Sequence, residues 1–447
     1  MHYILDIYLV KGERHERISG YYTTLCPIPF RDNLSSECLA IARRTGFLKR
    51  LRKIHPLFFL RALVMTSFQA APSFRLIALS LSLLSSQSIT KQAVAKHMGR
   101  ECVEFMRGAV SALIVKLCSA DKLRNAGVFQ PFRRVLLQDS TQIRLREHLA
   151  NYFPGPTNQN RKDGAALKIQ VVYNLLDETF PYFGLSGFRR TDQAASADIL
   201  SVAKPGDLVL RDLGYFATPI FQKLIDPGIH FLSRLRQNVT ILDPQSLKRI
   251  DLLKRLRSCG RFDQNILLGA EQKVQVRLVA LPVPEQVANE RRRKAKNHRD
   301  RRRNPSKEDL ELLRWNIFVT SVESCTWSPE TIQNVYGMRW RIEIIFKSWK
   351  SHLSLTVTAT GSADQVEALI WAKLFAICLF QKMLACFDHC MPKPISLLKS
   401  AQLFPLLLLS SLKDYITAGL STKLIDTHLR LEKRKKNSCV AVPHSLS

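Results

Sequence analysis

The 447-residue sequence has few acidic side chains for its size. Asp and Glu total 37 against 67 Lys and Arg, which gives a formal net charge of +30. Such an excess destabilises a compact chain by self-repulsion unless a polyanion shares its surface. The composition therefore predicts a nucleic acid as partner, with a membrane surface as the alternative.

Long uncharged apolar runs are absent too. Crossing a bilayer takes about 20 apolar residues; residues 403–409 are too few, and Lys373 and Lys382 interrupt residues 368–385. Residues 1–17 contain neither a basic leader nor a long apolar segment, which argues against export. We therefore expect a soluble cytoplasmic protein with no membrane partner.

Paired cysteines are the third absence. The ten cysteines form no C-x-x-C pair. Cys386 and Cys390 lie one helical turn apart with His389 between them, but a structural zinc site needs two further ligands, and none follows at a familiar interval. The sequence therefore disfavours zinc, and we expect small core cysteines in a reducing compartment.

The N-terminal part of the chain is predicted to be helical. Residues 1–35 have little pattern and are predicted to form an arm, whereas residues 36–125 repeat apolar side chains at helical spacing. Within this region, residues 88–117 begin with a capping Ser88 and turn at Gly99, as a helix-turn-helix would. Together with the charge this predicts a DNA-binding domain, although many pairs of short helices never contact DNA.

Residues 126–236 have the periodicity of strands. An apolar run ends at Asp139, residues 166–176 alternate, and residues 179–188 return as a hairpin partner. A helix predicted at residues 192–203 precedes a second buried strand that ends at Asp212, and a helix and a strand follow it. This order predicts an α/β fold, a mixed sheet flanked by helices, as the first part of a core.

Residues 237–313 are predicted to interrupt that core. Val274, Val276, Leu278 and Ala280 alternate along a strand, and residues 290–304 form a basic block. We predict a β-rich insertion with a basic loop, which is either solvated or a phosphate-binding surface. Trp315 then opens a strand at the start of the second part of the core, residues 314–360; it is either a core residue or a stacking platform.

The segment 336–350 is predicted to be one helix with two adjoining stripes. Its polar stripe contains Tyr336, Arg339, Glu343 and Lys350, which share one face at about 100° per residue. Its apolar stripe consists of Met338, Ile342, Ile345, Phe346 and Trp349. Glu343 therefore lies at the rim of the buried face, between cations that keep it ionised. Ordinary surface pairing of Glu343 with Arg339 is the alternative.

Asp139, Asp212 and Glu343 form a candidate site. Each Asp follows a strand at the edge where α/β proteins usually place their sites, although an Asp there more often caps the next turn. Three carboxylates from two strands and one helix can hold two hard cations through oxygen ligands. The rest of the chain, residues 361–447, is predicted to be a helical C-terminal region with a basic tail; the apolar helix 363–390 packs internally or pairs two protomers.

The spacing of Tyr336, Arg339, Glu343 and Lys350 resembles the signature of the IS-four family of bacterial insertion-sequence transposases. The segments 139–141 and 212–216 look like the two aspartate motifs of that family, in the same order, and the long insertion before the glutamate is similar as well. The resemblance covers roughly residues 85–390.

The resemblance implies a ribonuclease-H-like core in which Asp139, Asp212 and Glu343 bind two Mg²⁺ ions, for which Mn²⁺ can substitute. It implies that Tyr336, Arg339 and Lys350 contact DNA near the cleaved end, and that Trp315 stacks on a base extruded from it.

The implied function is a DNA transposase that binds the ends of an insertion sequence, cleaves them and joins the 3′ ends to target DNA. Its partners would be double-stranded DNA, both terminal inverted repeats and target, and a second copy or more in a synaptic complex, in the nucleoid-associated bacterial cytoplasm. A transposase-derived DNA-binding protein, or a metal-dependent nuclease without strand transfer, is the alternative.

Overall fold

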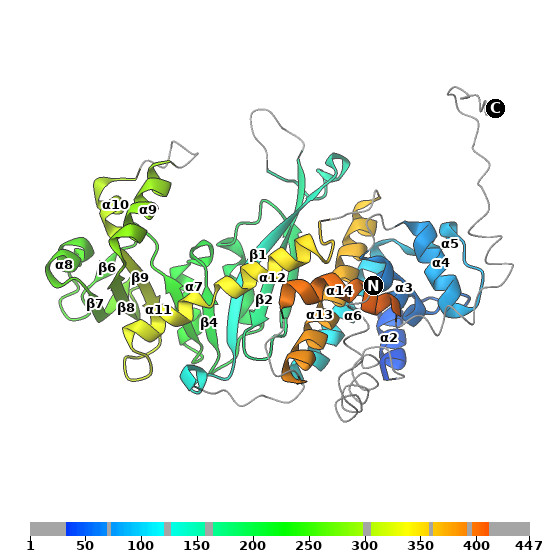
Figure 1. Ribbon diagram of the computed structural model, residues 1–447, viewed down its shortest axis with the longest axis horizontal. Helices are drawn as coiled ribbons and strands as arrows, with labels where there is room; N and C mark the ends of the chain where they lie inside the picture. The colour runs from blue at the N-terminus through cyan, green and yellow to red at the C-terminus, as the bar shows by residue number, and fades with distance from the viewer. Residues whose placement is uncertain are drawn as a thin grey trace, which may run out of the picture.

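The computed structural model describes residues 33–68, 73–119, 127–156, 164–297, 305–356, 361–390 and 396–410. The predicted arm at residues 1–35 lies outside these residues except for its last three, and so does most of the predicted C-terminal tail. A single sheet runs through the middle of the molecule, between a helical region at one end and the insertion at the other (Figure 1).

The sheet has nine strands within the described residues, in the order β3-β2-β1-β4-β5-β9-β8-β7-β6. Its strands are β1 Val135–Leu145, β2 Ala165–Asn174, β3 Tyr182–Gly187, β4 Leu208–Arg211, β5 His230–Arg234, β6 Ile241–Leu242, β7 Phe262–Leu268, β8 Val274–Pro282 and β9 Trp315–Thr320. β1, β4 and β5 are parallel, and the other pairs are antiparallel. The predicted α/β class and the predicted β2–β3 hairpin are confirmed.

Both faces of the central strands are buried, which explains their continuous apolar sequences. In register across β1, β4 and β5, one row of side chains enters the core cluster on the side of the helical region, and the next row enters the opposite cluster. The first row is Leu137, Leu210 and Leu232, and the second is Leu136, Val209 and Phe231. These strands are therefore a rigid base for whatever follows their carboxyl ends.

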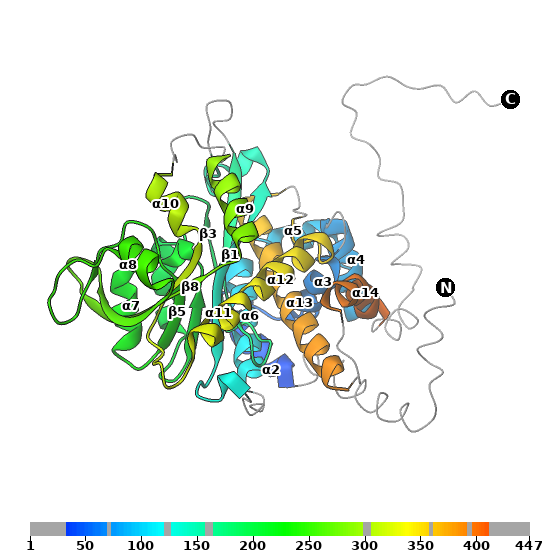
Figure 2. The ribbon, with the colours of Figure 1, turned by 60° about the vertical axis from the view of Figure 1, so that its left-hand side comes forward.

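The helical region joins segments from both ends of the chain. Its helices are α2 Asn33–Arg44, α3 Pro56–Thr66, α4 Phe74–Ser85, α5 Lys91–His97, α6 Arg100–Ser119, α13 Ala363–Cys390 and α14 Leu397–Ser410. α13 lies against α6 and α3 (Figure 2). On the first turns of α6, Glu104 pairs with both Arg100 and Arg107, so this face offers little free positive charge to a phosphate. DNA binding by α5 and α6, the helix-turn-helix predicted at residues 88–117, stays a prediction.

α13 is the helix among the described residues that is long and apolar enough to cross a membrane, and 83% of its most apolar window is buried inside the protein. Its Lys373 is 1% exposed and donates from Nζ to the carbonyl oxygen of Ser354 at 2.5 Å. Internal packing, one of the two predicted uses of this helix, is confirmed.

The insertion extends the sheet, because β8 pairs with β9 and β9 pairs with β5. Its helices are α8 Leu252–Cys259, α9 Glu285–Lys296 and α10 Lys307–Leu312. The prediction of a basic loop is wrong for residues 290–296, which belong to α9: Arg, Lys, Glu and Ala are good helix formers, and Glu290 pairs with Lys294 one turn on. Residues 298–304 lie outside the described residues.

The helix predicted at 336–350 is two helices, α11 Pro329–Gly337 and α12 Trp340–Ser351. Across the junction, the amides of Met338, Arg339 and Arg341 each bond a carbonyl three residues earlier, which tightens the path into turns. Gly337 lowers the cost of ending α11 there, since glycine is a poor helix former. Met338 is 39% exposed and was wrongly assigned to the apolar stripe, whose other members are buried.

One further α-helix, α7 Thr218–Ile225, confirms the helix predicted after β4. The helix predicted at residues 192–203 is a 3₁₀ helix, Ala194–Ser201; other 3₁₀ turns are Gly127–Phe129, Glu147–Leu149 and Leu213–Tyr215.

Candidate active site

Asp139 and Asp212 lie side by side at the end of the parallel pair β1 and β4. Gln138 and Arg211 are the last residues that these strands pair with each other, so the next residue on each is one of the two aspartates. The sequence predicts that this strand ends at Asp139, but β1 continues to Leu145 along β2. The aspartates nevertheless occupy equivalent places on adjacent strands.

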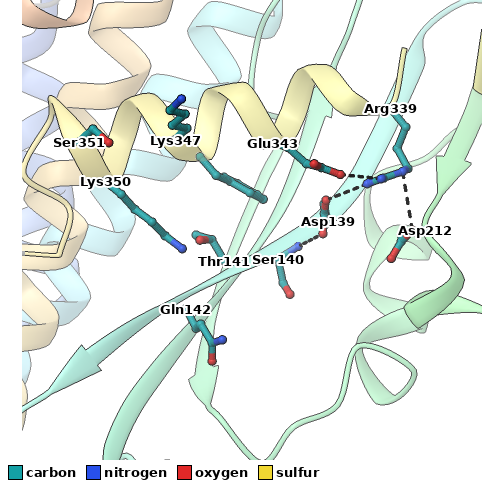
Figure 3. A pocket seen from close by; sticks show the side chains of 11 residues that line it. Asp139, Ser140, Thr141, Gln142, Asp212, Arg339, Glu343, Lys347, Lys350 and Ser351 are labelled. Atoms are coloured by element: carbon teal, nitrogen blue, oxygen red, sulfur yellow. Dashed lines mark hydrogen bonds and ion pairs between the residues drawn. The ribbon is translucent and has the colours of Figure 1, made fainter. Parts of the chain in front are cut away.

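Glu343 reaches the same place from α12, the helix that crosses above these strand ends (Figure 3). The helix is held down by its apolar side, where Ile342 and Trp349 are fully buried. The carboxylate of Glu343 keeps a side-chain exposure of 45%, close to the 42% of Asp212, whereas Asp139 is only 17% exposed. Asp139 is thus the deep member of the group, and the other two are open to a ligand.

One guanidinium contacts all three carboxylates. Arg339 places Nη2 at 2.6 Å from Oε1 of Glu343, Nη1 at 3.4 Å from Oδ2 of Asp139, and Nε at 3.7 Å from Oδ1 of Asp212 (Figure 3). Arg339 directly precedes α12 and its side chain is 18% exposed. Three acidic groups that are far apart in the chain therefore converge around a single cation.

Burial shifts the protonation of this group. It raises the pKa of Asp139 to about 6, although the backbone N–H of Ser140 and the charge of Arg339 act in the opposite direction. Burial alone would lower the pKa of Arg339, but the neighbouring carboxylates, Asp212 first, raise it. Arg339 thus stays charged, and the site is a cluster of opposite charges at low exposure.

A cavity of about 570 Å³ opens in front of the carboxylates. Its charged lining comprises Asp139, Asp212, Arg339, Glu343, Lys347 and Lys350. Sequence reasoning did not single out Lys347, although it follows Glu343 by one helical turn and the same periodicity would have found it. Acidic groups at one end and two lysines along the helix make a cavity suited to a phosphate backbone beside bound cations.

Two of the predicted site residues do not line this cavity. Tyr336 is 9% exposed, and its ring packs 5.1 Å from that of Phe318; burial raises the pKa of Tyr336 to about 12. Trp315 lies in the core cluster that the central strands share with the insertion, and its Nε1 donates to the carbonyl of Gly260 at 2.8 Å. The stacking role of Trp315 stays a prediction, and it requires the indole to leave this packing.

The donor set fits Mg²⁺, which takes oxygen ligands and is usually held by one or two carboxylates together with phosphate and water. Among the residues that the structure describes, no three His, Cys, Asp or Glu side chains stand grouped as metal ligands, and the guanidinium of Arg339 lies between the three carboxylates. Cation binding therefore calls for a shift of Arg339 relative to the acids.

Residues 130–379 match the family described as "Transposase DDE domain", a span that contains the whole of the site. The chain is 27% identical over 359 residues to a transposase for insertion sequence element IS231C of Bacillus thuringiensis subsp. berliner, covering 75% of this chain and 74% of that one. It is 23% identical over 369 residues to a transposase for IS1151 of Clostridium perfringens, covering 77% of each. A piggyBac transposase in a synaptic complex with hairpin DNA aligns with a TM-score of 0.44 at 11% identity over 92% of this chain and 85% of that one, a likeness too weak to argue from.

Because the matched span covers more than half of the chain and includes the strands and the helix that carry the three acids, this protein belongs to the family of transposases with a DDE domain and is a DNA transposase.

Proposed function

We propose that Asp139, Asp212 and Glu343 are the metal-binding triad of this transposase, that it uses Mg²⁺ or Mn²⁺, and that it is a member of the IS-four family. The observation that carries the proposal is the convergence of all three carboxylates on one cationic side chain. The antiparallel set β3-β2-β1 followed by the parallel set β1-β4-β5 supports a ribonuclease-H-like core.

Two bound ions would supply a nucleophilic water at neutral pH and stabilise the leaving 3′ oxygen. The protein's part is to hold the acids in place: β1 and β4 fix Asp139 and Asp212, and α12 fixes Glu343. Above a pH of about 6 Asp139 is mainly ionised and available as a ligand. Lys347 and Lys350 line the cavity, with the side chain of Lys350 extending toward β1 (Figure 3), and they would neutralise the phosphates of the DNA strand beside the cleaved bond.

The partners are double-stranded DNA, at the ends of the element and at the target, and further copies of the chain in the synaptic complex. The net charge of +30 supports the DNA partner. Tyr336, Arg339 and Lys350 as DNA contacts, Trp315 as a stacking residue, and residues 36–125 as a DNA-binding domain belong to the same proposal. A DNA-binding derivative is less favoured because this chain has all three acids, and a nuclease without strand transfer is less favoured because the matched family consists of transposases.

Cleavage of the element's own ends tests the triad. Asp139→Asn, Asp212→Asn and Glu343→Gln should each abolish cleavage in Mg²⁺ while binding of the end DNA continues, because each removes a ligand charge without changing size. Glu330→Gln, an exposed acid on α11, is the matched control and should cleave normally. Cleavage by purified Glu343→Gln would refute the assignment.

A further inference from the structure

A fourth carboxylate, Asp192, lies behind the triad. It belongs to the segment between β3 and the 3₁₀ helix Ala194–Ser201, and its side chain is 33% exposed. Its Oδ1 accepts three hydrogen bonds from two neighbouring strands: from Ser140 Oγ at 2.8 Å, Lys168 Nζ at 3.2 Å and Gln170 Nε2 at 3.3 Å. Asp192 therefore connects its own segment to β1 and β2 at the level of the site.

The same side chain packs against the loop that follows β4. A Cβ placed on Gly214 would lie 3.4 Å from both Cβ and Oδ2 of Asp192, so the backbone at Gly214 runs alongside this carboxylate. The next residue, Tyr215, is buried and donates its hydroxyl to Oε1 of Gln170 at 2.5 Å. Through Gln170, Asp192 is linked to this loop a second time.

These contacts adjoin two members of the triad. Ser140 directly follows Asp139 and uses both of its donors here, since its backbone N–H bonds Oδ1 of Asp139 at 2.7 Å while its hydroxyl bonds Asp192. Gly214 is two residues beyond Asp212. Asp192 thus contacts Ser140, which follows Asp139, and Gly214, which follows Asp212 by two residues.

We propose that Asp192 is a positioning residue for the metal site: it fixes the ends of β1 and β4 so that Asp139 and Asp212 keep the spacing that divalent cations need. The inference rests on the proposed triad and adds a residue that does not touch the cations. Groups that hold metal ligands in place commonly change metal affinity by about 10- to 100-fold when removed.

The chain offers a matched comparison six residues further on. Asp198, in the 3₁₀ helix Ala194–Ser201, is also a partly buried carboxylate; it accepts hydrogen bonds from Nη1 and Nη2 of Arg190 and from the hydroxyl of Tyr182. None of these partners adjoins Asp139 or Asp212 in sequence. If Asp192 only holds its segment against the sheet, replacing it should have the same effect as replacing Asp198. If Asp192 is a positioning residue, replacing it should also change metal binding.

The experiment is a Mn²⁺ titration of the full-length protein bound to its end DNA, followed by electron paramagnetic resonance of free Mn²⁺. Asp192→Ala should weaken Mn²⁺ binding by about 10-fold or more, and Asp192→Asn should weaken it less, because the amide oxygen can still accept from Ser140. Asp198→Asn should bind Mn²⁺ as the wild type does. Thermal unfolding and end-DNA affinity, measured alongside, separate a general loss of structure from a change at the site.

Two results would overturn the inference: wild-type Mn²⁺ affinity in Asp192→Ala, or an equal weakening in Asp198→Asn. If Asp192→Ala does not fold, Asp192→Asn and Ser140→Ala decide, and wild-type affinity in both counts against it. Asp139→Asn keeps this failure apart from that of the triad. Should Asp139→Asn bind Mn²⁺ normally, the triad itself is wrong; should it lose Mn²⁺ while Asp192→Ala keeps it, only the role of Asp192 falls.

Discussion

The ionised side chain of Asp139 is expected to lower the free energy of unfolding of the protein. Burial raises its pKa from 3.8 to about 6, so its ionised form is disfavoured in the folded state. The cost is absent below pH 3.8, grows between 3.8 and 6, and is complete above about 6. At about 1.4 kcal/mol for each pKa unit, it reaches about 3 kcal/mol at neutral pH.

Asp139→Asn removes this charge and keeps the shape of the side chain. We expect the variant to be more stable than the wild type by about 3 kcal/mol at pH 7 to 8 without divalent cations, with the difference vanishing toward pH 4. The assay is equilibrium urea unfolding of both proteins across this pH range. Added Mn²⁺ should then stabilise the wild type and not the variant, because only a folded site binds the ion.

A control with the opposite sign is available in the insertion. Hydrogen bonds from Ser246, the backbone N–H first, lower the pKa of the exposed Asp243. Asp243→Asn should therefore lose stability at neutral pH, and the loss should disappear as the pH falls through the folded pKa. Equal stability of Asp139→Asn and wild type at pH 8, or a difference that does not vary with pH, would refute the reasoning.

Two further predictions compare residues of α12 and the residue directly before it. Arg339→Ala should weaken binding of the element's end and reduce the slope of log affinity against log salt concentration by about 1, as for a lost phosphate contact. Arg341 is exposed and pairs with Glu178, so Arg341→Ala should keep the slope. An unchanged slope in Arg339→Ala would count against the phosphate contact. Trp349→Ala should cost about 3 to 5 kcal/mol in urea unfolding because the indole is fully buried; Trp340→Ala, 62% exposed, should cost little, and equal losses would contradict the burial of Trp349.

The strands were predictable because their burial leaves a periodic trace in the sequence. Residues 166–176 alternate because every second side chain of β2 enters the core cluster on the helical side, whereas the side chains between them are mainly polar although buried. The short apolar run before Asp212 follows from a strand with apolar cover on both faces. The same logic led to the carboxyl ends of β1 and β4 and so to Asp139 and Asp212. Glu343 was found from helical spacing, which holds locally even though the helix is broken before Arg339.

Other features depended on contacts that no local pattern records. The break between α11 and α12 follows from turns at Gly337 and Met338, and it places Arg339 directly before α12 rather than inside one long helix. Helical spacing pairs Arg100 at the start of α6 with Glu104 alone, but in the fold Arg100 also contacts Glu367 of α13, 267 residues later in the chain. Asp192 is the first residue of the helix predicted at 192–203, where an acid commonly acts as a cap, so nothing distinguished it from other capping acids until β1 and β2 were placed beside it.

The residues of the site could be found from the sequence, but the contacts that Arg339 makes with all three acids could not. The sequence pattern made it the partner of Glu343 alone, one turn away, worth a few tenths of a kcal/mol. In the fold it also faces Asp139 and Asp212, 200 and 127 residues earlier in the chain. A cation at that point balances three acids that would otherwise repel one another. If the three acids bind divalent ions as proposed, those ions would compete with this guanidinium for the same oxygens, and DNA phosphates that drew Arg339 away would at the same time free the carboxylates for metal.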